Sequence, residues 1–513
     1  MCYNIIDILR TLRKGNLIFM KISRSVISLL LLAAILTGCG QVPQTGNDVN
    51  DTTSSGESSA EVTDYAYPYP DTGYGGEEFG ILNMADMYTM HCAVLRDELT
   101  GDVLDDAVFN RNKLIETKFD IKLNETLVTD TWELKTTAAT AQKSILAGDN
   151  EYDVMFLPIK GAIGLITDGA FLDLEGVSAV QLDQPWWYDS FNRAIELGGK
   201  LYGAMGGAHL CIHDATRVMA FNADMMERLG LDLPYDTVRD GKWTLDAMNT
   251  YLSAAANLNG DDSAAWKKDG KVVYGYANNQ NGIIKFLQSC GENIVEVQDG
   301  KLRYTAGTER FYDCISKLSK VFTTSDAKGI NCPNGDDWKD DDGNPGYIYV
   351  FTSGRALFSD CEVNKFQGFR KLDFEYGIVP YPKYDESQKN YCCNTWEGSP
   401  AALIPVTSAD PEKAGLILDA MAYEGEKTVV PAFRDYAVEQ KGLRNDDSVE
   451  MLSIATKNII PMYFSIFGLD SSISDQAGTD VWTGTTSISS KVASAEPKIT
   501  TQISEVMEKW SGA

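Results

Sequence analysis

Apolar positions along the chain follow two different spacings from about residue 80 onward. Residues 121–128 alternate apolar and polar side chains, which predicts a strand, and residues 81–89 are predicted as another strand. Residues 105–119 and 132–147 repeat apolar side chains at helical spacing. Residues 152–157 form a short continuous apolar run, which is typical of a buried parallel strand. Strands that alternate with helices predict an α/β fold.

A different apolar segment lies near the N-terminus. Residues 26–36 are uninterrupted by charge and follow Lys21 and Arg24. A basic start, a short apolar stretch and small residues after it are typical of an export signal. The stretch is too short for a membrane span, which needs about 20 residues.

The end of this signal matches a bacterial lipobox. Residues 36–39 read Leu-Thr-Gly-Cys. The match implies cleavage after residue 38 and a diacylglycerol on the Cys39 thiol, which would anchor the protein to the outside of the cell membrane. The alternative is a plain signal peptide followed by an incidental cysteine. Because Met20 opens a compact signal of its own, residues 1–19 are consistent with an upstream mis-start.

The mature chain divides into a tether and a body. Residues 39–79 are rich in Ser, Thr, Gly and Asp and nearly lack aliphatic side chains, so we expect a disordered tether. The body from residue 80 is too long for a single core, and we expect two lobes.

Charge excludes some classes of function. The chain has 73 Asp and Glu against 45 Lys and Arg, a formal net charge of −28. Nucleic-acid binding and docking on an anionic membrane both need a basic surface. Three histidines in 513 residues leave little material for a multi-histidine metal centre. We predict no cofactor.

Several segments, in one order, resemble extracellular solute-binding proteins of ABC importers, in the family that holds many sugar binders. The segments are residues 152–158, 169–174, 199–203, 218–231 with Trp243-Thr-Leu, 351–358, 376–382 and 403–405 with 411–423. Each is weak alone, but their shared order behind a lipobox and a tether is specific. Position 223 is Ala where the family often has Lys, and residues 336–342 look like an acidic insertion.

The resemblance implies a fold of the two-lobe type II periplasmic-binding-protein kind, with a hinge and a ligand cleft between the lobes. Lobe 1 would comprise residues 80–215 plus about 400–425. Lobe 2 would comprise residues 216–395 plus about 426–513.

The resemblance also implies the function. The protein would be the lipid-anchored substrate-binding component of an ABC importer, a monomer rather than an enzyme. It would bind an extracellular solute, an oligosaccharide by preference, and deliver it to permease subunits. A peptide or a polyamine would also suit an acidic, aromatic cleft. The alternatives in function are a surface glycoside hydrolase and an interaction lipoprotein without a transport role.

Sugars are bound by aromatic faces and by polar side chains that reach hydroxyl groups. The candidates for such contacts follow predicted strands or lie at the two expected crossings between lobes. They are Asp130, Trp132, Pro158, Lys160, Trp187, His209, His213, Asp360, Glu362, Trp396 and Glu397. Each has a plainer alternative: Asp130 as a helix cap, Lys160 as a solvated lysine, Asp360 and Glu362 in a solvated turn, and Trp396 in the hinge core.

Cysteine and histidine pose two further questions. If residues 209–213 form a strand, His209, Cys211 and His213 share one face and could ligate Zn²⁺, although a fourth ligand is missing. Eight cysteines besides Cys2 and Cys39 allow 105 pairings, so the sequence assigns no disulfide.

Overall fold

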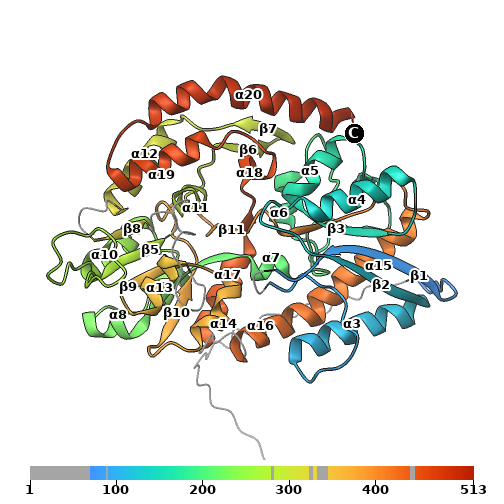
Figure 1. The fold of residues 1–513 in the computed structure, drawn as a ribbon, viewed down its shortest axis with the longest axis horizontal. Coiled ribbons are helices and arrows are strands. Elements are labelled where there is room, and N and C mark those ends of the chain that lie inside the picture. Colours follow the sequence, from blue (N-terminus) through green and yellow to red (C-terminus); the bar gives the residue numbers. More distant parts are fainter. Residues whose placement is uncertain are drawn as a thin grey trace, which may run out of the picture. The chain divides into compact units, whose positions relative to one another are not determined.

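The computed structural model describes residues 70–87, 90–278, 282–322, 327–331, 345–439 and 445–512. The export signal, Cys39, most of the tether and the 336–342 insertion lie outside these residues. Two β-sheets dominate the body (Figure 1). No helix among the described residues is long and apolar enough to cross a membrane.

The first sheet has four strands in the order β12-β3-β1-β2. Strands β1 (Glu77–Met84), β2 (Ile121–Val128) and β3 (Val154–Pro158) are parallel, and β12 (Pro400–Leu403) joins antiparallel to β3. All five residues of β3 are buried, as expected for a parallel strand covered on both faces.

Helices α3 (Val103–Phe119) and α4 (Thr136–Ala147) connect the parallel strands. Asp102 fixes the start of α3, because its carboxylate accepts the N–H groups of Leu104 and Asp105. The helix ends at Asp120, whose φ of 48° lies in the left-handed region. The strand and helix expected over 121–128 and 105–119 are therefore confirmed.

Three predicted boundaries differ from the structure. β1 begins at Glu77, so the tether ends before residue 80. α4 begins at Thr136 rather than at 132, because a turn precedes it in which Leu134 has a φ of 58°. β1 also ends at Met84 rather than at residue 89. Helix α5 (Ile159–Thr167) follows β3 directly.

The second sheet has five strands in the order β10-β4-β9-β5-β8. β4 (Arg217–Asn222) lies antiparallel to both β10 (Tyr376–Val379) and β9 (Ala356–Glu362). β5 (Tyr274–Asn278) is parallel to β9 and to β8 (Gly329–Asn331). Aromatic side chains pack around this sheet, including Phe221, Phe358 and Trp243.

Two chain segments cross between the two sheets and run beside each other. Helix α7 (Cys211–Asp214) precedes β4, and β11 (Cys393–Asn394) precedes β12. Thr216 and Thr395 form an antiparallel bridge where these segments pass each other. Figure 1 places α7 and β11 between the two sheets.

The C-terminal helices also contact both halves of the body. α16 (Val430–Glu439) packs against α3, and α17 (Asp446–Lys457) packs against β10. The last helix, α20 (Ile488–Gly512), packs against α5 and against the hairpin of β6 (Val295–Gln298) and β7 (Lys301–Tyr304). Its Trp510 is 2% exposed and packs edge to face on Tyr202.

Candidate functional site

Residues from three separate parts of the chain meet where the crossing segments join the sheets. Arg217 and Glu362 belong to the second sheet, Glu397 to the crossing before β12, and Lys160 to the first turn of α5. We call Lys160, Arg217, Glu362, Trp396 and Glu397 the junction residues.

Two ion pairs link four of the junction residues. Arg217 and Glu362 face each other in the register of β4 and β9, with Arg217 Nη2 3.2 Å from Glu362 Oε1. Lys160 Nζ lies 3.7 Å from Glu397 Oε1, and the Lys160 backbone N–H donates to the Glu397 carbonyl at 3.2 Å. The two pairs are linked electrostatically, because Arg217 of the second sheet also acts on the Glu397 carboxylate of the crossing.

Glu397 is the central carboxylate of this group. Ser465 Oγ, from helix α18 (Tyr463–Ile466), donates to Glu397 Oε1 at 3.1 Å. Burial raises the pKa of Glu397, but Arg217 and Lys160 outweigh it and leave the pKa below its ordinary value. The carboxylate is therefore ionised at neutral pH and can accept further hydrogen bonds.

Trp396 is partly buried and lies beside a small apolar cluster apart from the main core. We call this cluster the sulfur cluster because most of its members carry sulfur. Its buried residues are Met84, Met90, Cys92, Leu134, Cys211 and Ala215, and Met87 packs against them. The tryptophan thus packs on a fixed apolar support and remains only partly buried, which suits contact with a ligand.

Asp360 lies deeper than the sequence predicted. β9 runs to Glu362 instead of ending near Phe358, so Asp360 is inside the strand and 2% exposed. Its carboxylate forms an ion pair with Lys285 of helix α11 (Gly282–Ser289) and accepts the Tyr381 hydroxyl. Burial raises the pKa of Asp360, but Lys285 and Arg217 hold it below its ordinary value. The solvated turn is therefore wrong for Asp360.

Asp130 serves the start of a helix. Its carboxylate accepts N–H groups from Thr131, Thr136 and Thr137 at 2.8 to 3.1 Å. Burial opposes ionisation, but these backbone donors hold the pKa of Asp130 below its ordinary value. The plainer alternative, a cap, describes this residue.

Three other candidates differ in their surroundings. Trp132 is 74% exposed, and Pro158 is the buried last residue of β3. Trp187 is 2% exposed, and its Nε1 donates to Asp419 at 2.8 Å. Trp186 donates to the same carboxylate, so both indoles are held in the core of the first lobe.

The proposed strand at 209–213 is wrong, because Cys211–Asp214 form a helical turn. His209 Nδ1 accepts the Cys211 N–H, and His213 Nε2 lies 2.7 Å from the Tyr188 hydroxyl. Burial lowers the pKa of His209 to about 3 and that of His213 to about 4, with Arg111 and Arg434 adding to the respective shifts. Among the described residues, no three His, Cys, Asp or Glu side chains gather to hold a metal ion.

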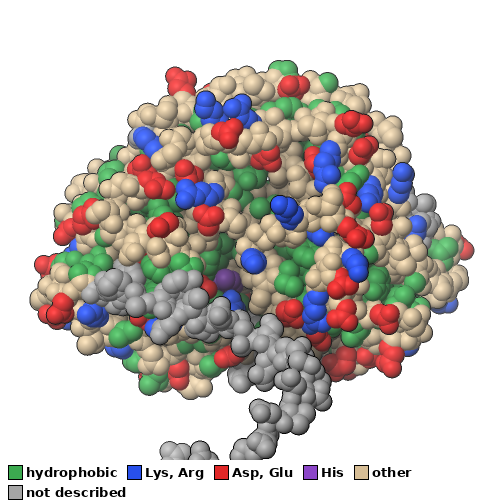
Figure 2. Space-filling model, turned by 180° about the vertical axis from the view of Figure 1, so that it is seen from behind, with side chains coloured by type: hydrophobic (Ala, Val, Ile, Leu, Met, Phe, Trp, Pro, Cys, Tyr) green, Lys and Arg blue, Asp and Glu red, His purple; other side chains and the backbone are tan. Residues whose placement is uncertain are grey.

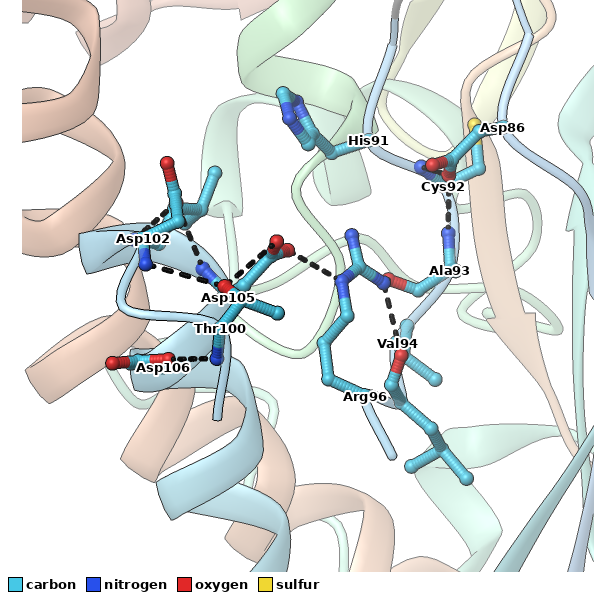
Figure 3. A network of polar contacts seen from close by, with 12 residues as sticks. Asp86, His91, Cys92, Ala93, Val94, Arg96, Thr100, Asp102, Asp105 and Asp106 are labelled. Atoms are coloured by element: carbon cyan, nitrogen blue, oxygen red, sulfur yellow. Dashed lines mark hydrogen bonds and ion pairs between the residues drawn. The ribbon is translucent and has the colours of Figure 1, made fainter. Parts of the chain in front are cut away.

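Sequence reasoning missed a pair beside this helix. His91 Nδ1 lies 2.6 Å from Asp214 Oδ2, and the His91 backbone N–H donates to the same oxygen at 2.7 Å. Figure 3 shows the segment that carries His91, with Asp86 accepting the N–H groups of Cys92 and Ala93. Residues 91 and 214 are far apart in the sequence, and no local pattern predicts that they meet.

An ion pair of Arg96 links the same segment to α3. Its Nε lies 2.6 Å from Asp105 Oδ1, in the first turn of that helix (Figure 3). The segment after β1 is therefore held both to the crossing helix α7 and to α3.

A surface cavity of about 490 Å³ adjoins the junction. It shares Lys160 with the junction residues and Leu134 with the sulfur cluster. Its other walls come from α5, from α18 with the residues after it, and from the last turns of α20, including Phe467, Val506 and Lys509.

On the face drawn in Figure 2, basic side chains are interspersed with acidic ones rather than gathered in one stripe.

Comparisons with known proteins identify the fold. No family model matches the chain, and no curated protein matches it in sequence. Among solved structures, the maltose-binding periplasmic protein MalE from Listeria monocytogenes, in complex with maltose, has a TM-score of 0.53 at 15% identity, covering 84% of this chain and 98% of that one.

Two other structures share this likeness and differ in ligand. The galacto-N-biose-/lacto-N-biose I-binding protein of the ABC transporter from Bifidobacterium longum, in complex with lacto-N-biose, has a TM-score of 0.53 at 12% identity (84% and 98% covered). UgpB from Mycobacterium tuberculosis, in complex with glycerophosphocholine, has a TM-score of 0.51 at 14% identity (84% and 99% covered). The chain therefore has the two-lobe α/β fold of ABC-transporter solute-binding proteins, as the sequence resemblance implied.

Proposed function

We propose that this protein is the solute-binding component of an ABC importer and that it captures a carbohydrate at the junction residues. The observation that carries the proposal is the meeting of Lys160, Glu397, Arg217 and Glu362 from both sheets beside the half-buried Trp396. A site shared by two sheets can change shape when the lobes move.

The chemistry of the junction favours a sugar. An indole face supports the apolar C–H patch of a pyranose ring, while carboxylates and cationic side chains bond its hydroxyl groups. Two of the three structural relatives above were solved with sugars, and the third was solved with glycerophosphocholine. The fold therefore leaves the ligand open, and the preference for carbohydrate rests on the junction residues.

Binding would proceed without bond cleavage. The Thr216–Thr395 bridge marks where two crossing segments run together and is our proposed hinge. Closure around the ligand would bring Arg217 and Glu362 toward Lys160, and opening would release the ligand to permease subunits. The lobe boundaries of the sequence analysis, a monomeric state and a lipid on Cys39 belong to the same proposal.

A thermal-shift and calorimetry panel tests the ligand class. It should contain mono- and oligosaccharides, polyamines, short peptides and glycerophosphodiesters. A ligand at 100 times its Kd stabilises the folded state by about 2.7 kcal/mol, which raises the Tm by roughly a degree or more in a body of this size. A response to sugars supports the proposal, and a response confined to another class replaces the carbohydrate assignment.

Two tryptophan variants locate the site. Trp396→Ala should abolish the response to the sugar, while Trp132→Ala should leave it unchanged, because Trp132 is 74% exposed and lies outside the sulfur cluster. The reverse result would move the site to the start of α4. Turnover of a chromogenic glycan by the purified protein would instead favour a hydrolase.

The membrane anchor needs its own test. Mass spectrometry of the mature N-terminus from the membrane fraction should find a diacylglycerol on Cys39. Cys39→Ala should release the protein from the membrane. An unmodified Cys39 in membrane-derived protein would refute the anchor without affecting the ligand proposal.

A further inference from the structure

Four buried cysteines lie in two neighbouring pairs. Cys92 and Cys211 both belong to the sulfur cluster. Cys290 directly follows α11, and Cys314 lies within helix α12 (Glu309–Phe322), which packs against α11. Arg310 of α12 donates to the Cys290 carbonyl at 3.3 Å, which holds this helix beside Cys290. All four side chains are at most 1% exposed.

The first pair connects segments that other contacts already hold together. Cys92 is flanked by His91, whose ring and N–H both bond Asp214 of α7. The preceding residue, Met90, has its Sδ 3.8 Å from Cys211 Sγ. Residues 90 to 92 therefore all lie against the turn of helix α7, which places Cys92 and Cys211 in the same buried cluster.

The remaining described cysteines have different surroundings. Cys361 lies in β9, where its Sγ contacts the Glu362 carbonyl at 3.2 Å. Cys392 and Cys393 are consecutive, and adjacent residues do not bond without backbone strain. The nearest competitor for a pair is Cys392, which lies within electrostatic range of Cys290.

We propose that Cys92–Cys211 and Cys290–Cys314 are disulfide sites that become oxidised as the chain folds. This goes beyond carbohydrate binding and depends only on the export proposed above, since oxidising compartments lie outside the cytoplasm. The oxidant there would be a dithiol–disulfide oxidase. In a test tube, glutathione disulfide serves the same role.

The chemistry balances in two exchange steps. The Cys92 thiolate attacks glutathione disulfide, forms a mixed disulfide and expels one glutathione thiolate. The Cys211 thiolate then attacks the Cys92 sulfur and expels the second. Two protein thiols lose two electrons and two protons, and one glutathione disulfide is reduced to two glutathione molecules.

Burial of the thiols determines when they can be oxidised. The neighbouring thiol of Cys92 and burial both raise the pKa of Cys211 well above its ordinary value, and Cys290 and burial do the same to Cys314. Thiolate is the reactive form, so the folded reduced protein should react slowly and the refolding chain quickly.

The test is a peptide map of the whole chain refolded from reductant and denaturant into glutathione buffer. Free thiols are alkylated in denaturant, and the digest is read by mass spectrometry. We expect crosslinked peptides 92–211 and 290–314, with Cys361, Cys392 and Cys393 alkylated. Alkylation of Cys92 and Cys211, or a 290–392 link, overturns the corresponding pair.

Serine variants supply the control. Cys92→Ser should lose the first link, leave Cys211 alkylated and keep the second link, whereas Cys361→Ser should keep both. Because Cys92 and Cys211 enclose a long stretch of chain, oxidised wild type should melt roughly 2–5 °C above reduced wild type, and Cys92→Ser should lose part of that gain. The map needs no ligand, so its failure is distinct from failure of the sugar panel.

Discussion

The two sheets are stabilised in opposite ways near the junction. The first sheet borders the sulfur cluster, where Met84, Met90 and Leu134 are at most 3% exposed and pack with Trp396. The second sheet contains the ion pair of Asp360 and Lys285, both also at most 3% exposed. The first side tolerates changes of shape at constant volume, and the second depends on the pairing of charges.

The largest effect should come from breaking the buried ion pair. Lys285→Met leaves the Asp360 carboxylate without its cation in the interior and should lower the free energy of unfolding by about 3–5 kcal/mol. Denaturant titration measures this loss. The matched control is Lys242→Met, which removes an exposed pair with Asp240 and should leave stability almost unchanged. Equal losses in the two variants would refute the contrast.

Removing volume from the sulfur cluster should come next. Met84→Ala creates a cavity at a residue that is 0% exposed and should cost about 2–5 kcal/mol. Met84→Leu keeps the volume and should cost less than about 1.5 kcal/mol. Leu146→Ala, at a position 80% exposed, is the surface control. A penalty for leucine as large as that for alanine would show that sulfur, rather than packing, is needed there.

Acid should weaken the crossing helix before it weakens the second sheet. The pKa of His213 is about 4 in the folded chain against about 6.5 unfolded, so the unfolded state binds more protons between these values. Stability should therefore fall from pH 7 toward pH 4 by up to about 3 kcal/mol for this residue. Urea titrations across this range should show a shallower fall for His213→Gln.

The carboxylate of the second sheet titrates in a lower window. Because the pKa of Asp360 is below its ordinary value, its ionised pair stabilises the fold above that ordinary value and is lost only as pH falls further. If the His213→Gln protein lost as much stability between pH 7 and pH 4 as the wild type, groups other than His213 would be responsible for that loss.

The smallest effect on stability should come from Lys160. Its side chain is 42% exposed and its nitrogen lies 3.7 Å from Glu397, so Lys160→Met should cost at most about 1 kcal/mol. Its effect on sugar affinity, measured by calorimetry, should exceed its effect on unfolding. A stability loss above 2 kcal/mol with unchanged affinity would make Lys160 a structural residue.

The local sequence pattern was sufficient to predict much of the first sheet. The alternation over residues 121–128 predicted β2 with its observed bounds, and the apolar run before Pro158 predicted β3. Both signals come from side chains a few residues apart, which is the range over which period and burial can be read. The predicted start of α4 was wrong because a turn intervenes and the Asp130 carboxylate accepts the N–H groups of Thr136 and Thr137, which fixes the start of the helix there.

Site residues were harder to predict than strands. Trp396 and Glu397 were chosen from their place at an expected crossing and Lys160 from its place after a predicted strand, and the structure brings these three together. Arg217 and His91 were missed, since their partners Glu362 and Asp214 are more than a hundred residues away. Trp187 was chosen as an aromatic candidate. In the structure its indole donates to Asp419, from a distant helix, and is held in the core.

The amino-acid sequence alone was sufficient for the alternation of strands and helices, the net acidic charge and the resemblance to solute-binding proteins. The charges that meet, the cysteines that share a cluster and the tryptophan that stays partly buried became known only from the folded chain. Periodicity reports how each segment buries its own apolar face, over a few residues. Contacts between segments depend on how distant parts of the chain pack: the register of β4 and β9 brings Arg217 to Glu362, and the packing of residues 90–92 on α7 brings Cys92 to Cys211.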